Sequence, residues 1–133
     1  MSPTFPIRTE CPPGACECDR ERLLADPEAD LRVLMLTKEE EKKLVARLEN
    51  LADLAELRRF EERLRAQLGI VIRVEPGARE VRTARGIAIE VEARPGLCRK
   101  TRQTIPAAIR RSLEKNPEIV YALLNARDLL GDA

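Results

Sequence analysis

The stretch "AQLGIVIRVEPG", residues 66–77, contains the change of hydrophobic period that decides the fold. Up to Gly69 the apolar residues recur at helical spacing, and Gly69 is a typical residue just beyond a helix C-terminus. After it the period becomes two, so that Ile70, Ile72 and Val74 share one face of a strand. The proline–glycine pair that follows predicts a turn. The chain therefore passes from helix to sheet within one short segment.

Upstream of this segment, "TKEE" (residues 37–40) has the pattern of a capping box, with Thr37 followed three residues later by Glu40. It predicts the start of a helix with an acidic first turn, as the helix dipole favours. Asn50 or Asp53 is the point at which this long helix can divide into two. The apolar stripe that the helix would bury consists of Leu44, Leu48, Leu51, Ala55, Leu64 and Leu68.

Two shorter elements precede this helix. A helical turn is predicted over residues 19–25, where Asp19 caps it and the pair Asp26-Pro27 ends it. The sequence "LRVLML" (residues 31–36) alternates weakly between the two sides, and we interpret it as a short strand.

Downstream of the turn, residues 87–93 alternate again and predict a second strand antiparallel to the first, with "EVRT" (residues 80–83) extending it. Another proline–glycine pair then closes the sheet. Thr104 caps one helix, and Asn116, which precedes a proline, caps a second helix that ends at Leu130.

The order of these elements predicts an α+β fold. Its expected parts are a small mixed sheet, formed by a β-α-β crossover and a hairpin, a long central helix and two C-terminal helices. We expect residues 1–18 to be an irregular segment rich in cysteine and proline, and residues 19–133 to form a single α+β domain. A chain of 133 residues is long enough to bury an aliphatic core without disulfides.

Composition excludes several classes of enzyme. The chain contains no histidine, which removes Ser-His-Asp and Cys-His catalysis and histidine-ligated metals. It also lacks the glycine-rich motifs that hold nucleotide phosphates. We therefore lean away from an enzyme while leaving that question open. No apolar run has the length of a membrane span or the pattern of a secretory signal, so we expect a cytoplasmic protein with no membrane partner.

The feature that carries chemistry is "CPPGACEC", residues 11–18, which holds three of the four cysteines. Its central proline and glycine predict a turn that brings Cys11 and Cys16 together, and Cys18 lies two residues further on. Cys98, in a loop after the second proline–glycine pair, is the candidate fourth ligand. In a reducing compartment such a cluster favours metal or redox chemistry over disulfides.

Four thiolates are the ligands of a structural zinc ion or an iron–sulfur cluster, and the sequence leaves the two open. With an iron–sulfur cluster we expect an electron-transfer or cluster-accessory protein. With zinc we expect a module that binds a protein partner. The net negative charge of the centre would be offset by Arg99, Lys100 and Arg102, which flank Cys98. The alternative from the same residues is a regulatory protein whose thiols undergo redox chemistry.

A second constellation is the basic segment 99–115, which has six basic residues and one acidic residue. Its candidate anion- or partner-binding residues are Arg99, Lys100, Arg102, Arg110 and Arg111. They predict, as the rival function, a nucleic-acid-binding protein, although the chain has few aromatic side chains to stack on bases. Within the fold, the acidic stretch 19–30 is another candidate partner of this segment.

Overall fold

The computed structural model describes residues 20–77 and 86–127. Its helices are α1 (Arg20–Ala25), the 3₁₀ turn η1 (Arg32–Met35), α2 (Lys38–Leu48), α3 (Leu54–Arg63), the π-helical turn η2 (Leu64–Leu68), α4 (Arg99–Lys115) and α5 (Pro117–Arg127). The strands are β1 (Ile72–Pro76) and β2 (Ile87–Val91). The predicted α+β class is confirmed.

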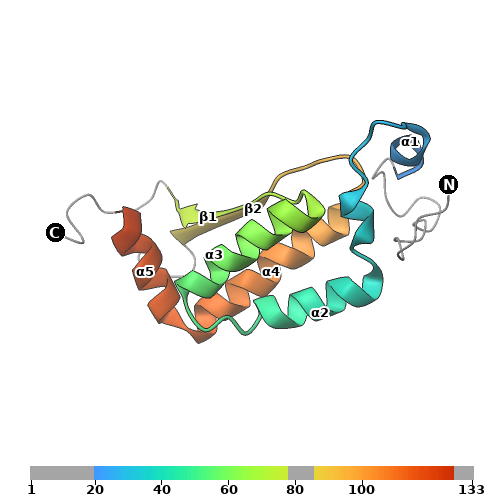
Figure 1. The fold of residues 1–133 in the computed structure, drawn as a ribbon. Coiled ribbons are helices and arrows are strands. Elements are labelled where there is room, and N and C mark those ends of the chain that lie inside the picture. The colour runs from blue at the N-terminus through green and yellow to red at the C-terminus, as the bar shows by residue number, and fades with distance from the viewer. Residues whose placement is uncertain (1–19, 78–85, 128–133) are drawn as a thin grey trace.

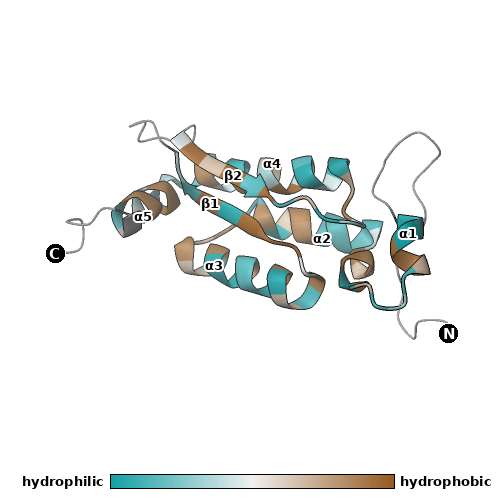
Figure 2. Cartoon of the chain, turned by 90° about the horizontal axis from the view of Figure 1, so that it is seen from above, coloured by the Kyte–Doolittle hydropathy of each residue, from teal (hydrophilic) through white to brown (hydrophobic). Residues whose placement is uncertain are grey.

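Helices pack against one face of the hairpin formed by β1 and β2. Figure 1 shows α2 and α3 diverging from their short connection as the two arms of a V, with α4 between them in this view. Helix α4 packs against α2. Seen from above, the hairpin lies between α3 and α4 (Figure 2). Helix α4 packs against β2, and α5 packs against β1. Helices from both halves of the chain, α3 before the hairpin and α4 and α5 after it, therefore lie at the same face of the hairpin.

The hairpin follows the predicted period of two. Strands β1 and β2 pair antiparallel, with Val74 opposite Ile89 and Arg73 opposite Glu90. Val74 is buried, whereas Arg73 and Glu90 are exposed on the other face. The predicted extension at residues 80–83 lies outside the described residues. The inner face of the hairpin is thus apolar, and its outer face carries charge.

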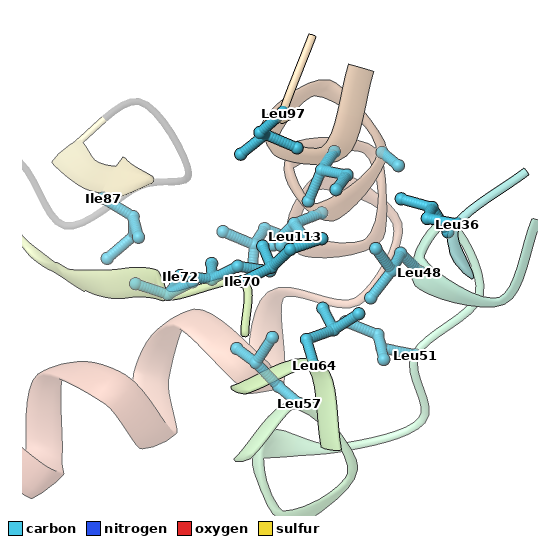
Figure 3. Packing of buried hydrophobic residues seen from close by; sticks show 14 of the residues in the cluster. Leu36, Leu48, Leu51, Leu57, Leu64, Ile70, Ile72, Ile87, Leu97 and Leu113 are labelled. Atoms are coloured by element: carbon cyan, nitrogen blue, oxygen red, sulfur yellow. The ribbon is translucent and has the colours of Figure 1, made fainter. Parts of the chain in front are cut away.

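The core under the hairpin is almost entirely aliphatic. Figure 3 shows leucines of α3 and α2 and isoleucines of the strands pointing toward Leu113 of α4. The largest side chains in it with less than 2% exposure are Leu34, Leu48, Leu57, Ile70, Ile87, Ile105, Ile109, Leu113, Ile119 and Leu123. Burial of this kind contributes about 1.5–3 kcal/mol for each such side chain.

The predicted caps of the central helix are present. The Thr37 hydroxyl accepts a hydrogen bond from the Glu40 N–H at 3.3 Å. The helix divides, and Asp53 caps the second part by accepting from the Glu56 N–H at 2.8 Å. Gly69 ends η2 in the left-handed conformation, with φ of 69°. Each of these boundaries is set by a residue that suits it locally.

The strand predicted over residues 31–36 is wrong, because the segment forms the 3₁₀ turn η1. The Asp30 carboxylate accepts from the Arg32 N–H at 3.1 Å and starts this turn. Val33 and Leu34 are adjacent and both fully buried, which a strand with one solvent-exposed face does not allow. In the described residues the sheet consists of β1 and β2 alone, without the expected crossover.

The start predicted for the next helix is also wrong. Helix α4 begins at Arg99, with Cys98 as its N-cap residue, and Thr104 lies inside it, donating its hydroxyl to the Lys100 carbonyl at 2.8 Å. The buried face already begins at Thr101 and continues through Ile105, so that packing extends the helix by more than one turn. Pro106 is accommodated within α4 despite its missing N–H.

Helix α4 holds the connection between α2 and α3. Buried Ser112 donates its hydroxyl to the Leu48 carbonyl and accepts from the Leu51 N–H at 3.0 Å. Asn116, which precedes α5 as predicted, donates its side-chain amide to the Ala52 carbonyl at 2.7 Å. The predicted end of α5 at Leu130 lies outside the described residues. These bonds fix the vertex of the V against α4.

Candidate metal and anion site at the start of helix α4

Cys98 is the one predicted thiol ligand that lies in the described residues. It occupies the N-cap position of α4 in an extended conformation, and its carbonyl accepts from the Arg102 N–H at 3.1 Å. The expected loop position is wrong in one respect, since Cys98 is 8% exposed and belongs to the buried residues. Leu97, packed into the core beside it, draws the cysteine inward. A helix N-terminus stabilises negative charge, and a thiolate is a suitable anion there.

The loop before Cys98 is fixed by a close approach of backbone to core. Gly96 has φ of 87°, and a Cβ at this position would lie 2.7 Å from Leu23 of α1 and 2.7 Å from Val33 of η1. Only glycine fits both the left-handed conformation and this space. Helix α1 and turn η1 are thereby packed directly against the loop that carries Cys98.

Cys11, Cys16 and Cys18 lie outside the described residues. Within residues 20–77 and 86–127, no group of three or more potential metal ligands comes together. The first residue that the structure describes is Arg20, two residues after Cys18, where α1 begins. Leu23 of this helix lies against Gly96, in the loop that carries Cys98.

The five candidate basic residues divide into two groups along α4. Arg99 and Lys100 are exposed in the first turn, and half-buried Arg102 follows them. Arg102 has a buried Nε with no hydrogen-bond partner. One turn from the other end, Arg110 donates to the Ile87 carbonyl at 3.1 Å, and Arg111 pairs with Glu49. The structure brings the first three to the helix N-terminus and engages the last two with other elements.

An ionic cluster that no sequence motif indicated lies next to this loop. The Asp30 carboxylate accepts from the Arg32 guanidinium at 2.7 Å and from Arg94 at 3.3 Å. Arg94 also donates to the Gly69 carbonyl, and Arg32 donates to the Ala66 carbonyl at 2.7 Å. The cluster ties η1, the end of η2 and the loop before α4 together.

The Arg32 guanidinium, hydrogen-bonded to Asp30, holds the pKa of that carboxyl well below its usual range, and Arg94 adds to the effect. The pairing of Asp30 with Arg94 joins the acidic stretch 19–30 to the loop before α4. Arg94 lies outside the basic segment 99–115, which was the expected partner of this stretch, and no motif in the sequence identified either residue of the pair.

Comparisons with known proteins assign the chain to no family. No protein-family model matches it, and neither a curated protein nor a solved structure is significantly similar to it. Among the described helices, none combines the length and apolar character that crossing a membrane requires.

Proposed function

We propose that the chain binds one metal centre through the thiolates of Cys11, Cys16, Cys18 and Cys98. The observation that carries the proposal is the position of Cys98, at the N-cap of α4 in a loop that packs against α1. Helix α1 begins two residues after Cys18, so that the chain length allows the N-terminal thiols to reach this loop.

The surroundings of Cys98 suit a centre with negative charge. Four thiolates around Zn²⁺, or around an oxidised cluster of two irons and two sulfides, carry a net charge of about −2. Arg99 and Lys100, in the first turn of α4, make no hydrogen bond or ion pair with other described residues through their side chains. Their charge and the partial positive charge of the helix N-terminus support a thiolate site here.

The role that follows depends on the metal. An iron–sulfur cluster would supply one-electron chemistry, and the chain would act in electron transfer or as a cluster accessory with a protein partner. Zinc would instead join the N-terminal segment to the start of α4 and support a protein-interaction module. Reduced thiols require a reducing compartment, so we place this function in the cytoplasm.

The test is the metal content of the full-length protein purified without oxygen. We expect close to one centre per chain, with visible absorption for iron–sulfur and stoichiometric zinc in a colourless sample otherwise. Cys98→Ser should abolish the centre. Serine is a good N-cap residue, so helix content by circular dichroism should stay unchanged and exclude unfolding as the cause.

Two results would overturn the proposal. One is wild-type protein without metal, with four titratable thiols, that does not take up zinc or iron and sulfide. That outcome favours the redox-thiol alternative, and a disulfide to Cys98 formed on mild oxidation would identify it. The other is a Cys98→Ser variant that keeps the full metal content, which would remove Cys98 from the site.

A further inference from the structure

A groove lies between the two arms of the V. Its walls are α2 and the continuous segment α3–η2, and the end of η1 closes one end of it. Its volume is about 1100 Å³, which is above the range of about 300–1000 Å³ typical of small-molecule pockets. The groove exists because α2 and α3 diverge from a vertex held by Ser112 and Asn116 (Figure 1).

The floor of the groove is apolar. Leu36 and Leu64 are buried at its base, and Leu44, Phe60 and Leu68 are only partly covered. Partly covered side chains of this kind release water when a partner packs on them, which is the main source of affinity in a helix-binding groove.

The rim of the groove is mainly basic. Lys38, Lys43 and Arg47 line it from α2, and Arg63 lines it from α3. Two acidic residues, Glu39 and Glu40, lie at the η1 end of the groove, and Glu40 is 3.7 Å from Lys43. The Arg47 guanidinium lies 5.8 Å from the centre of the Phe60 ring and so bridges the two walls. The groove as a whole presents positive charge around an apolar floor.

We infer that this groove binds an amphipathic helix of a partner protein whose apolar stripe is flanked by acidic residues. The apolar side of such a helix matches the leucine and phenylalanine floor, and its carboxylates match the lysines and arginines of the rim. None of the described residues that line the groove is a ligand of the proposed metal centre, so that its test does not depend on metal binding.

The charge of the rim argues against a second copy of this chain as the occupant. A two-fold symmetric contact would place the same patch on both partners. Lys43 and Arg63 of one copy would then face basic side chains of the other, and like charges at close range oppose association. Charge complementarity instead selects an acidic partner.

The probe is a synthetic, fluorescein-labelled peptide of about 15 residues, with leucines at helical spacing and glutamates on both flanks. Two control peptides share its length: one has lysine in place of every glutamate, and one has the same composition in scrambled order. We expect the full chain to bind the acidic peptide about tenfold more tightly than either control, with affinity falling as salt rises.

The chain offers a matched pair of variants. Lys43→Glu with Arg63→Glu reverses two rim charges, and it should weaken binding of the acidic peptide about tenfold or more. Lys42→Glu with Arg59→Glu makes the same changes on the same two helices at exposed positions that do not line the groove. The second variant should bind within about twofold of wild type, because it alters net charge equally without touching the rim.

Amide spectra of the wild-type protein provide a test without substitutions. Adding the acidic peptide should shift resonances of α2, α3 and η2 and leave those of β1 and β2 in place. Equal binding of the acidic and scrambled peptides, equal loss in both variants, or shifts confined to other elements would overturn the proposal. So would sedimentation showing a dimer of the wild-type chain that the rim variant disrupts, since the groove would then hold a second copy.

Discussion

The two ends of helix α4 carry similar basic side chains and use them differently. At the C-terminal end, Arg111 pairs with Glu49, and Lys115 donates to the Glu49 carbonyl at 3.3 Å. At the N-terminal end, the side chains of Arg99 and Lys100 make no hydrogen bond or ion pair with described residues. One end uses its charge to hold the fold together, and the other presents its charge to solvent.

The difference comes from what surrounds each end. Near the C-terminal end, the carbonyls of Leu48 and Glu49 at the close of α2 need donors, and α4 supplies them. At the start of α4 the neighbouring loop is fixed by packing, through Gly96 and Leu97, and by Arg94, so that Arg99 and Lys100 are not needed to hold it. Basic residues in one helix can therefore be assigned to fold or to function only after their neighbours are known.

The largest expected loss of stability comes from a substitution in the packed loop at the N-terminal end of α4. In Gly96→Ala, a Cβ would meet Leu23 and Val33 at 2.7 Å with φ of 87°. Left-handed strain of about 1–2 kcal/mol and overpacking of about 1–3 kcal/mol should together lower the free energy of unfolding by about 3 kcal/mol. Urea denaturation monitored by circular dichroism measures this change.

Gly69→Ala is the matched control, because Gly69 is also left-handed, with φ of 69°. Its new Cβ would meet the tips of the Arg94 and Asp30 side chains, and Arg94 can move aside by giving up its bonds to the Gly69 carbonyl and Asp30. The loss should be about 2 kcal/mol, from backbone strain and a part-exposed ion pair but without overpacking of the core. Equal losses in the two variants would contradict the idea that the core fixes the loop at Gly96.

The next largest loss of stability is expected from removing a hydrogen bond at the C-terminal end of α4. Ser112→Ala removes a hydroxyl that is 1% exposed and leaves the Leu48 carbonyl and the Leu51 N–H without their partner. Unsatisfied buried groups cost about 1–3 kcal/mol, so the free energy of unfolding should fall by about 2 kcal/mol. Thr104→Ala is the control, since it removes a helix hydroxyl bond outside the core and should change stability by less than about 0.5 kcal/mol. Comparable losses would show that Ser112 does not hold the vertex.

The Asp30 cluster should give a pH dependence of smaller size, because Asp30 is 36% exposed. Its pKa is lowered in the folded protein, so the unfolded chain binds the proton more readily. The stabilisation is present above the unfolded pKa of about 4 and is lost as pH falls through the folded value. Denaturation midpoints between about pH 5 and pH 2 should fall more steeply for wild type than for Asp30→Asn. Parallel curves for the two proteins would leave the cluster without an energetic role.

Local signals in the sequence predicted much of the fold. Thr37, Asp53 and Gly69 mark helix boundaries because each satisfies backbone groups or a backbone angle within a few residues. The strands of the hairpin were predicted because the period of two does not depend on the rest of the chain. These features need only short-range physics.

The errors lie where distant contacts decide the conformation. Val33 is buried by the approach of Gly96, more than 60 residues away in sequence, and that contact favours the compact turn η1 over a strand. The start of α4 moved from Thr104 to Arg99 because Thr101 is buried. The groove was missed for the same reason, since Lys43 and Arg63 belong to separate helices whose charges look like solvated surface in the sequence.

The smallest expected changes in stability come from paired substitutions at the two ends of α4, which compare these ends directly. Arg99→Gln with Lys100→Gln should leave the free energy of unfolding within about 0.5 kcal/mol of wild type, because these side chains hold nothing in the described fold. Arg110→Gln with Arg111→Gln removes the bond to the Ile87 carbonyl and the pair with Glu49, and it should cost about 1 kcal/mol.

The first pair of substitutions should act on ligands instead. If the N-terminal cations offset the charge of a thiolate centre, Arg99→Gln with Lys100→Gln should lose metal to a chelator faster than wild type, while the Arg110 and Arg111 variant keeps the wild-type rate. If they serve nucleic acid, the same variant should weaken binding of a single-stranded RNA oligonucleotide and reduce its dependence on salt. A variant that changes stability but neither metal loss nor RNA binding would place Arg99 and Lys100 with the C-terminal end, as residues that hold the fold.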